Sequence, residues 1–166
     1  HSHSTPYGTD GAPRRRFQSY SDAWVVSALA CIAEAKAAAR PAKIRCREAP
    51  LDIAVNRRLP GPDGRVDFGW HENGAHDNTA QVLDLVDEHD RPFGCVVDIA
   101  CHPITLPPWS RRASADWVVA MRSRIEAEFG VPCGFVQGAC ADISPRHDWV
   151  TKSGKRPEPA ERYAGV

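Results

Sequence analysis

Two apolar runs joined by a short polar turn constrain the fold of this chain more than any other feature. The run TAQVLDLVDE (residues 79–88) and the run PFGCVVDIACH (residues 92–102) are rich in β-forming residues, and HDR separates them. A short polar connection between two such runs predicts a β-hairpin. The second run is nearly all apolar, which is typical of a central strand that is covered on both faces.

An alanine-rich stretch and an amphipathic stretch predict two helices. The first covers residues 21–40, where alanine dominates and Pro41 follows. Alanine has the highest helix propensity, and proline stops a helix. The second helix covers residues 114–130, with Ser114 as the N-cap and Gly130 at the carboxyl end, in keeping with residue preferences at helix ends.

The rest of the chain supplies further strands and a long connection. Residues 43–58 have strand-like content that Pro50 interrupts, which predicts two short strands or one broken edge strand. Residues 59–78 are dense in Gly, Pro, Asp and Asn and predict a long loop. Residues 133–144 predict another buried strand that leads into a bend. This order of elements is typical of an α/β layered domain with a mixed sheet flanked by helices.

The composition limits both the size of the fold and the class of partner. The 166 residues are enough for one domain, and 21 basic residues balance 21 acidic ones. We therefore expect a domain over residues 1–150, a polar loop or linker over residues 151–166, and no nucleic-acid partner. No apolar run approaches the roughly 20 residues that cross a bilayer, and no signal-peptide pattern is visible. We expect no transmembrane segment, and the compartment and oligomeric state stay open.

The cysteines indicate packing rather than disulfides or a zinc knuckle. The chain has six cysteines and no CxxC pair. Most of them lie in helical or strand-like apolar runs, and free cysteine is among the most buried residue types. The residues in these runs are Cys31, Cys95, Cys101, Cys133 and Cys140. We expect reduced, buried packing cysteines.

Four places combine reactive side chains with a strand end or a loop. They are His1 and His3 in HSH, residues 56–58 in VNRR, His102 in ACHPITL, and residues 142–144 in ADISPRH. His102 ends an apolar strand and is followed by proline, so its ring is held at the carboxyl edge of that strand. Catalytic groups in α/β sheets gather at such edges.

The pair HSH is compatible with a metal site. Alternating residues of an extended chain point the same way, so His1 and His3 can face one cavity. One ring can then bind a metal while the other exchanges a proton, and zinc takes neutral imidazole at about 2.0–2.1 Å. Spacing alone leaves other interpretations open: solvated histidines at a chain end, a structural role for His102, and a simple turn at Asp142.

In combination these motifs resemble the neutral (alkaline, non-lysosomal) ceramidase family. HSHSTP, VNRR, DIACHPITL followed by SADW, and GFVQGACADISP occur in that order. The likeness covers roughly residues 1–145 and is best from Gly74 onward, with QGACADISP its most distinctive stretch. The resemblance implies a zinc-dependent amidase that hydrolyses the N-acyl bond of ceramide to a fatty acid and a sphingoid base, and hence a small-molecule or lipid amide substrate.

The resemblance also implies roles for five residues. His1 and His102 correspond to two zinc ligands, and His3 corresponds to a histidine that contacts the substrate and the transition state. Arg57 corresponds to the arginine of the family's NRS element, and Ser144 to the loop serine proposed as the nucleophile. Zn2+ is therefore the expected cofactor, and His3 and Arg57 would stabilise the oxyanion.

The match departs from the family at several positions. Ala141 stands where the family usually has glycine, Arg146 where it has asparagine, Arg58 where it has serine, and Ser2 where it has threonine. The family's other zinc ligands, a glutamate and a tyrosine, come from a later part of its catalytic domain, and nothing after Val150 resembles those segments. Either the chain is a fragment, which we favour, or it uses other ligands.

Two other functions stay open. A metal-free serine hydrolase would need a base that touches Ser144, and the GxSxG elbow of that class is absent. A non-catalytic binding module would keep the fold after loss of the reaction. In the zinc-dependent mechanism we expect Asp142 to shape the serine loop rather than to act as a base. We expect Asp116 to act as an N-terminal charge on the second helix.

Overall fold

The computed structural model describes residue 3, residues 18–106 and residues 113–146. The chain divides into two compact units, one made of His1–Thr5 with Lys43–Val166 and one of Pro6–Ala42, and each is described by itself. The predicted zinc ligand His1 and the predicted linker over residues 151–166 lie outside the described residues.

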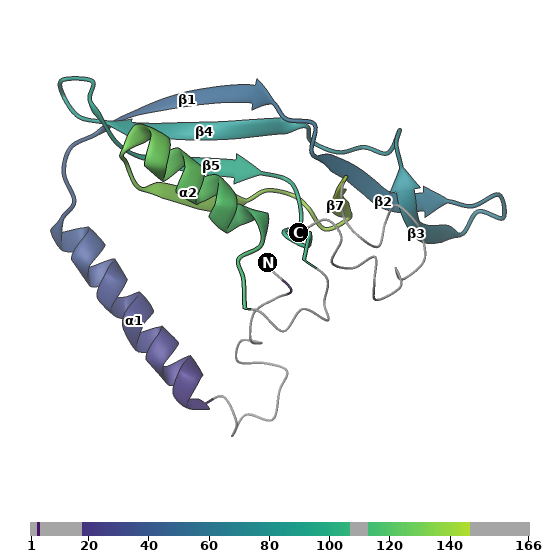
Figure 1. Ribbon diagram of the computed structural model, residues 1–166, viewed down its shortest axis with the longest axis horizontal. Coiled ribbons are helices and arrows are strands. Elements are labelled where there is room, and N and C mark those ends of the chain that lie inside the picture. Colours follow the sequence, from purple (N-terminus) through teal and green to yellow (C-terminus); the bar gives the residue numbers. More distant parts are fainter. Residues whose placement is uncertain (1–2, 4–17, 107–112, 147–166) are drawn as a thin grey trace. The chain divides into compact units, whose positions relative to one another are not determined.

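The smaller unit contributes helix α1, Gln18–Ala37, drawn in purple in Figure 1. It confirms the helix predicted over residues 21–40, although it begins earlier and ends before Arg40. Lys36 lies in its last turn, where a positive charge interacts favourably with the helix dipole. Among the helices that the structure describes, none is long and apolar enough to cross a bilayer.

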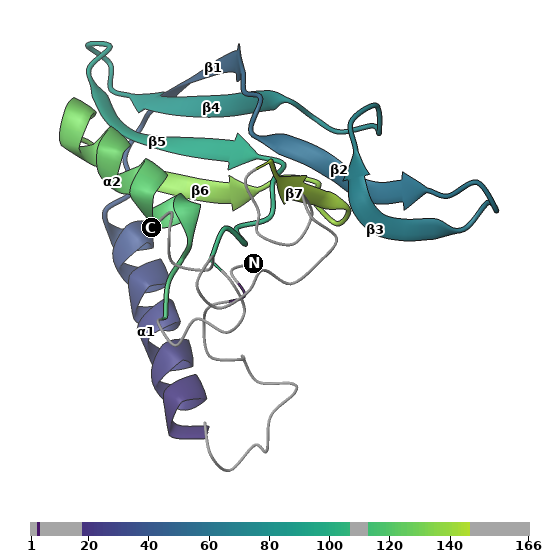
Figure 2. The same ribbon diagram turned by 45° about the vertical axis from the view of Figure 1, so that its right-hand side comes forward.

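The larger unit is built on a four-stranded mixed sheet, which we call sheet A. Its strands are β1 (Lys43–Pro50), β4 (Thr79–Val86), β5 (Pro92–Ile99) and β6 (Cys133–Gln137), in the order β1-β4-β5-β6. The pairs β1–β4 and β4–β5 are antiparallel, whereas β5–β6 is parallel (Figures 1 and 2). The predicted hairpin and the predicted α/β class with a mixed sheet are confirmed.

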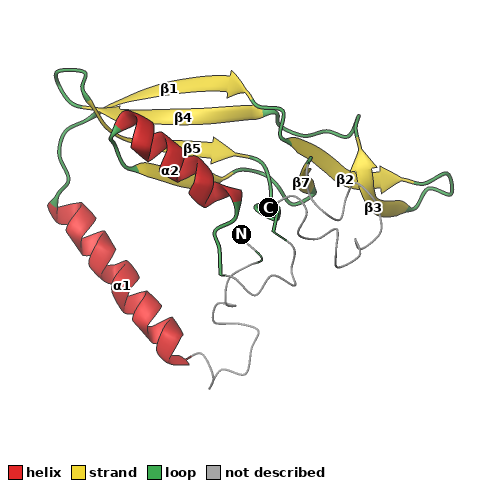
Figure 3. Ribbon diagram, in the orientation of Figure 1, coloured by secondary structure: helices red, strands yellow, loops and turns green. Residues whose placement is uncertain are grey.

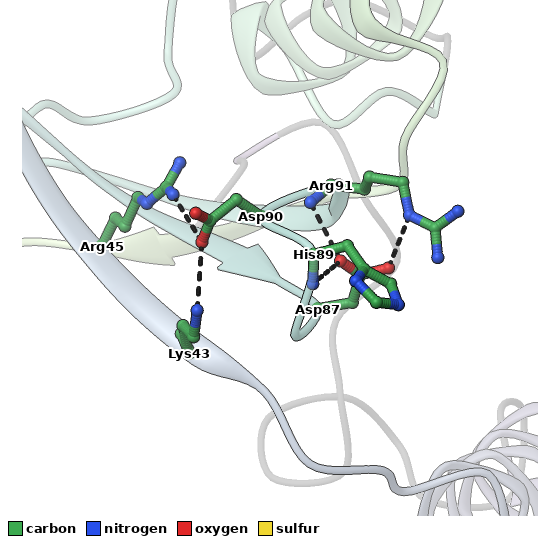
Figure 4. Close-up of polar contacts among 6 residues, drawn as sticks. All are labelled: Lys43, Arg45, Asp87, His89, Asp90 and Arg91. Carbon is green, nitrogen blue, oxygen red and sulfur yellow. Dashed lines mark hydrogen bonds and ion pairs between the residues drawn. The ribbon is translucent and has the colours of Figure 1, made fainter.

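The turn between β4 and β5 is held by the carboxylate of Asp87 (Figure 4). Asp87 Oδ1 accepts hydrogen bonds from the backbone N–H groups of His89 and Arg91, both at 2.9 Å, and Oδ2 accepts one from Arg91 Nε at 2.9 Å. Asp90 pairs with Arg45 at 2.7 Å and with Lys43 at 3.3 Å. These contacts join the turn to the neighbouring edge strand β1.

Helix α2, Trp117–Phe129, connects the parallel strands β5 and β6, as a parallel pair requires a crossover. Gly130 ends the helix in the left-handed conformation with φ 66°, as predicted. The prediction of Ser114 as the N-cap of this helix is wrong. Asp116 caps the helix by accepting from Trp117 N at 2.8 Å, and Ser114 Oγ instead accepts from Asp116 N at 3.0 Å.

The core lies between α2 and the face of sheet A that it covers. Val97 and Cys133 are among its most buried members, and Met121 and Ile125 of the helix pack against it. The cysteine prediction holds for four positions, Cys95, Cys101, Cys133 and Cys140, which are buried as thiols. It is wrong for Cys31, which is exposed. Cys46, which lies outside the runs named above, is exposed as well.

A second, antiparallel sheet, which we call sheet B, contains β3 (Val66–His71), β2 (Ala54–Pro60) and β7 (Ile143–Pro145) in the order β3-β2-β7. The prediction of a long loop over residues 59–78 is therefore wrong in its first part. A tight turn, in which Gly61 N donates to Arg65 O at 2.7 Å and Gly64 has φ 79°, returns the chain so that β3 pairs with β2.

The carboxyl end of β5 points toward β7 (Figures 2 and 3), and that of β6 does so as well (Figure 2), so the two sheets meet there. Gly138 N, just after β6, donates to Ile99 O at 3.2 Å, and His102 N, just after β5, donates to Ile143 O at 3.4 Å. The junction of the two sheets is therefore where the predicted site residues can meet.

Candidate functional site

His102 lies just beyond the end of β5, with a side chain that is held by the neighbouring sheet. It is only 2% exposed, and its ring Nδ1 lies 2.8 Å from the carbonyl oxygen of Ile143. A carbonyl can only accept, so Nδ1 carries the hydrogen and Nε2 carries the lone pair of the neutral ring. Burial is the largest cause that lowers the pKa of His102; the hydrogen bond to the Ile143 backbone acts in the opposite direction, and the nearby Arg57 charge lowers the pKa further. The net lowering favours the neutral ring, the form that binds metals.

Two side chains fix the backbone that carries His102. Gln137 Nε2 donates to Ile99 O at 3.2 Å and to Cys101 O at 3.0 Å. Trp117 Nε1 donates to His102 O at 3.1 Å. Sequence reasoning assigned no such role to Gln137 or Trp117, although both lie inside the motifs that carry the resemblance.

Ser144 occupies the centre of β7, where it pairs with Val55 of β2. Its side chain is fully buried, and its hydroxyl has no hydrogen-bond partner among the residues that the structure describes. Leaving a buried hydroxyl unpaired costs about 1–3 kcal/mol, so such groups often mark a site with a functional use. Ser144 directly follows Ile143, the residue whose carbonyl orients His102.

Arg57 holds the turn that leads into β7. Its Nη2 donates to Ala141 O at 2.7 Å, its backbone N–H donates to Asp142 O at 2.8 Å, and its guanidinium lies over the Phe68 ring, 5.4 Å from the centroid. Through these contacts Arg57 holds the turn that precedes Ile143 and Ser144.

Asp142 takes part in a polar network beside this turn. Its Oδ2 accepts from Asn56 Nδ2 at 3.2 Å and lies 3.6 Å from Arg58 Nε. Asn56 is 6% exposed and also donates to Ala75 O at 2.8 Å. This arrangement agrees with the expected role of Asp142 as the residue that shapes the serine turn.

His3 lies beside His102, with the two rings perpendicular and their centroids 6.0 Å apart. The structure thus brings together four of the five predicted site residues, His3, Arg57, His102 and Ser144. His1 is outside the described residues. The expectation that Asp116 serves the second helix is met, since this buried carboxylate caps α2 and accepts from Leu106 N at 2.7 Å.

Among the described residues, His102 is suited to be one ligand of a zinc ion. His102 has the buried, neutral ring with an anchored Nδ1–H that is typical of a metal-bound histidine. Within residue 3, residues 18–106 and residues 113–146, no group of three or more His, Cys, Asp or Glu side chains could hold a metal ion. The second predicted ligand, His1, belongs to the part of the chain outside this description.

No protein-family model and no curated protein sequence matches this chain. Solved structures do. The neutral ceramidase from Pseudomonas aeruginosa superposes with a TM-score of 0.56 at 22% identity, over 77% of this chain and 21% of the ceramidase. The fold is ceramidase-like. A ceramidase complexed with C2 gives a TM-score of 0.51 at 21% identity, over 64% of this chain and 17% of that one.

This chain therefore spans about a fifth of the length of the ceramidases that it resembles. The similarity to neutral ceramidase concerns the backbone, and it agrees with the resemblance that the sequence motifs indicated. The activity of the whole ceramidase belongs to that protein, and its transfer to this chain is a proposal.

Proposed function

We propose that this chain carries part of the active site of a zinc-dependent hydrolase that cleaves an N-acyl amide bond in a ceramide-like lipid. The observation that carries the proposal is the position of Ser144. Its hydroxyl is buried and unpaired within the described part of the chain, one residue from the carbonyl that orients His102. The ceramidase-like fold supports the same function.

The proposal gives each side chain a distinct task. His102 and His1 hold the zinc ion, which when bound supplies Lewis-acid polarisation of the scissile carbonyl. Activated by metal coordination, the Ser144 hydroxyl would attack the carbonyl carbon, and its proton would pass to the departing amine. Alternatively, the hydroxyl would orient the amide for attack by a water molecule. His3 and Arg57 stabilise the negative charge that develops on the carbonyl oxygen, a contribution of about 3–4 kcal/mol for a well-placed donor.

Arg57 is suited to this task because its position is already fixed. One guanidinium nitrogen donates to Ala141 O, and the plane lies over Phe68. A guanidinium has five N–H donors, so the contact with Ala141 leaves donors for a substrate. Because the group does not need to be ordered during the reaction, its charge is preorganised.

The structure favours this proposal over a metal-free serine hydrolase. That mechanism needs a general base within hydrogen-bond reach of the nucleophile. Among the described residues, no such base contacts the Ser144 hydroxyl. The non-catalytic binding module is the remaining alternative, and activity measurements separate it from an enzyme.

The test is hydrolysis of a short-chain fluorescent N-acylsphingosine by the purified chain, with and without added zinc. We expect zinc-dependent release of the fatty acid. Ser144→Ala should lower the rate by at least about 10³-fold. The matched control is Ser123→Ala, since Ser123 is exposed on α2, and this variant should keep the full rate.

Two results would contradict the proposal. A folded chain that binds the lipid amide but never turns it over would be a binding module. Equal rates for Ser144→Ala and Ser123→Ala would show that the Ser144 hydroxyl takes no part in the reaction.

A further inference from the structure

Arg146 lies two residues after Ser144, and its side chain joins segments that are far apart in the sequence. Its Nε lies 2.7 Å from Asp52 Oδ1, and its Nη1 lies 2.7 Å from Glu72 Oε2. The Arg146 backbone N–H also donates to Ile53 O at 2.8 Å. The side chain is only 23% exposed. Arg146 thus connects the end of β7 with the entry to β2 and with the exit from β3.

Strand β7 offers few contacts of its own to hold it in place. It has three residues, and among the strands that the structure describes it pairs with β2 alone, at the edge of sheet B. Its last residue, Pro145, has no N–H to donate to a ladder. At the amino end, Arg57 and Asn56 hold the preceding turn. At the carboxyl end, the contacts of Arg146 with Asp52, Glu72 and the Ile53 carbonyl hold the strand.

The position of the Ser144 hydroxyl is determined by the backbone of β7. No hydrogen bond to a described residue fixes the Ser144 side chain, so the backbone of β7 determines where the hydroxyl lies. A slip of one residue would turn each side chain of the strand to the opposite face. It would also move the Ile143 carbonyl, which orients the His102 ring at 2.8 Å.

The two carboxylates match the shape of a guanidinium. Two different nitrogens of Arg146 reach two carboxylates from separate segments, which a single ammonium group cannot reproduce with the same geometry. Asp52 and Glu72 are largely exposed, and exposed ion pairs add little to global stability. The effect of these contacts is therefore expected on the local order of β7.

We propose that Arg146 is a positioning residue that sets the register of β7 and thereby the position of the Ser144 hydroxyl, through its paired contacts with Asp52 and Glu72. The use of that position in amide hydrolysis rests on the proposed function. The order of the strand does not, so the two claims can be tested separately.

The test is backbone amide hydrogen exchange, followed by NMR in the full chain. In Arg146→Gln, exchange at Ser144 should become at least about tenfold faster, while exchange at Val97 in sheet A stays unchanged. Arg146→Lys should give an intermediate rate. The charge-swapped double variant Glu72→Arg with Arg146→Glu should recover only part of the protection, because the new carboxylate at position 146 would lie beside Asp52. Arg65→Gln, which breaks an exposed pair with Asp63, is the control and should leave Ser144 unaffected.

Unchanged exchange at Ser144 in Arg146→Gln would overturn the proposal. Equal acceleration at Ser144 and Val97 would also overturn it, because Arg146 would then stabilise the whole fold. In the amide assay, Arg146→Gln should lower kcat with little change in KM, and the charge-swapped variant should restore kcat only in part. If the unmodified chain shows no turnover, the proposed function fails, and the exchange rates still decide whether Arg146 positions β7.

Discussion

The ring of His102 donates a hydrogen bond of 2.8 Å to the carbonyl of Ile143, a residue 41 positions later in the chain. This bond joins the end of β5 to strand β7, and it sets the ring beside the residue that precedes Ser144. The candidate metal ligand and the candidate nucleophile therefore share one backbone segment. A change in the position of either one is expected to affect the other.

Gln137 should be needed for the stability of this junction. Gln137→Leu removes the hydrogen bonds to Ile99 O and Cys101 O, while Ile99 O keeps the Gly138 N–H as a donor. We expect a loss of about 0.5–1.5 kcal/mol in the free energy of unfolding, the usual net contribution of a hydrogen bond. Urea unfolding measures it. Gln81→Leu, at an exposed position in β4, is the control, and an equal loss in both variants would contradict the role of Gln137.

Asp87 should make stability depend on pH. The backbone N–H of Arg91 is the largest cause that holds the pKa of Asp87 below its ordinary value of 3.8, with the Arg91 side chain and His89 N–H acting in the same direction. A lowered pKa in the folded state stabilises the fold above the unfolded value. That contribution is lost as pH falls through the folded value.

The measurement for Asp87 is the difference in unfolding free energy between the unmodified chain and Asp87→Asn. We expect a constant difference from pH 8 to about pH 5 and a decline as pH falls below the ordinary value of 3.8. A difference that stays constant down to pH 2 would show that the turn does not depend on the ionised carboxylate.

The buried thiols should resist alkylation in the folded chain. Burial raises the pKa of Cys133 to about 11, and burial also raises the pKa of Cys140. The thiolate is the reactive form, so iodoacetamide at pH 8 should label the exposed Cys31 and Cys46 first. Mass spectrometry of labelled peptides checks this order, with a urea-unfolded sample as the control. Labelling of Cys133 at the rate of Cys46 would contradict the burial.

Local patterns in the sequence were sufficient for much of sheet A. The apolar run over residues 92–102 predicted the central strand, and the polar residues HDR predicted its hairpin with residues 79–88. Strand β3 was missed because Gly and Asp around it are typical of loops, and half of its residues are exposed. Ser114 was chosen as a cap from residue preference, whereas Asp116 lies directly before the helix and has more donors to accept from.

The site depended on contacts that local patterns do not contain. Motif order pointed to Arg57, His102 and Ser144, but nothing local indicated that Ile143 would accept from His102. Arg146 was noted only as a departure from the family pattern. Its partners Asp52 and Glu72 lie 94 and 74 positions away, and pairings over such separations follow from the tertiary fold.

The zinc content of the purified chain tests the central claim most directly. His102→Asn is the informative variant, because an amide can still donate to Ile143 O, and circular dichroism checks that it folds. His89→Ala, at an exposed turn position, is the matched control. We predict about one zinc per chain in the unmodified protein and in His89→Ala, and its loss in His102→Asn. Zinc that stays bound in a folded His102→Asn variant would contradict the account.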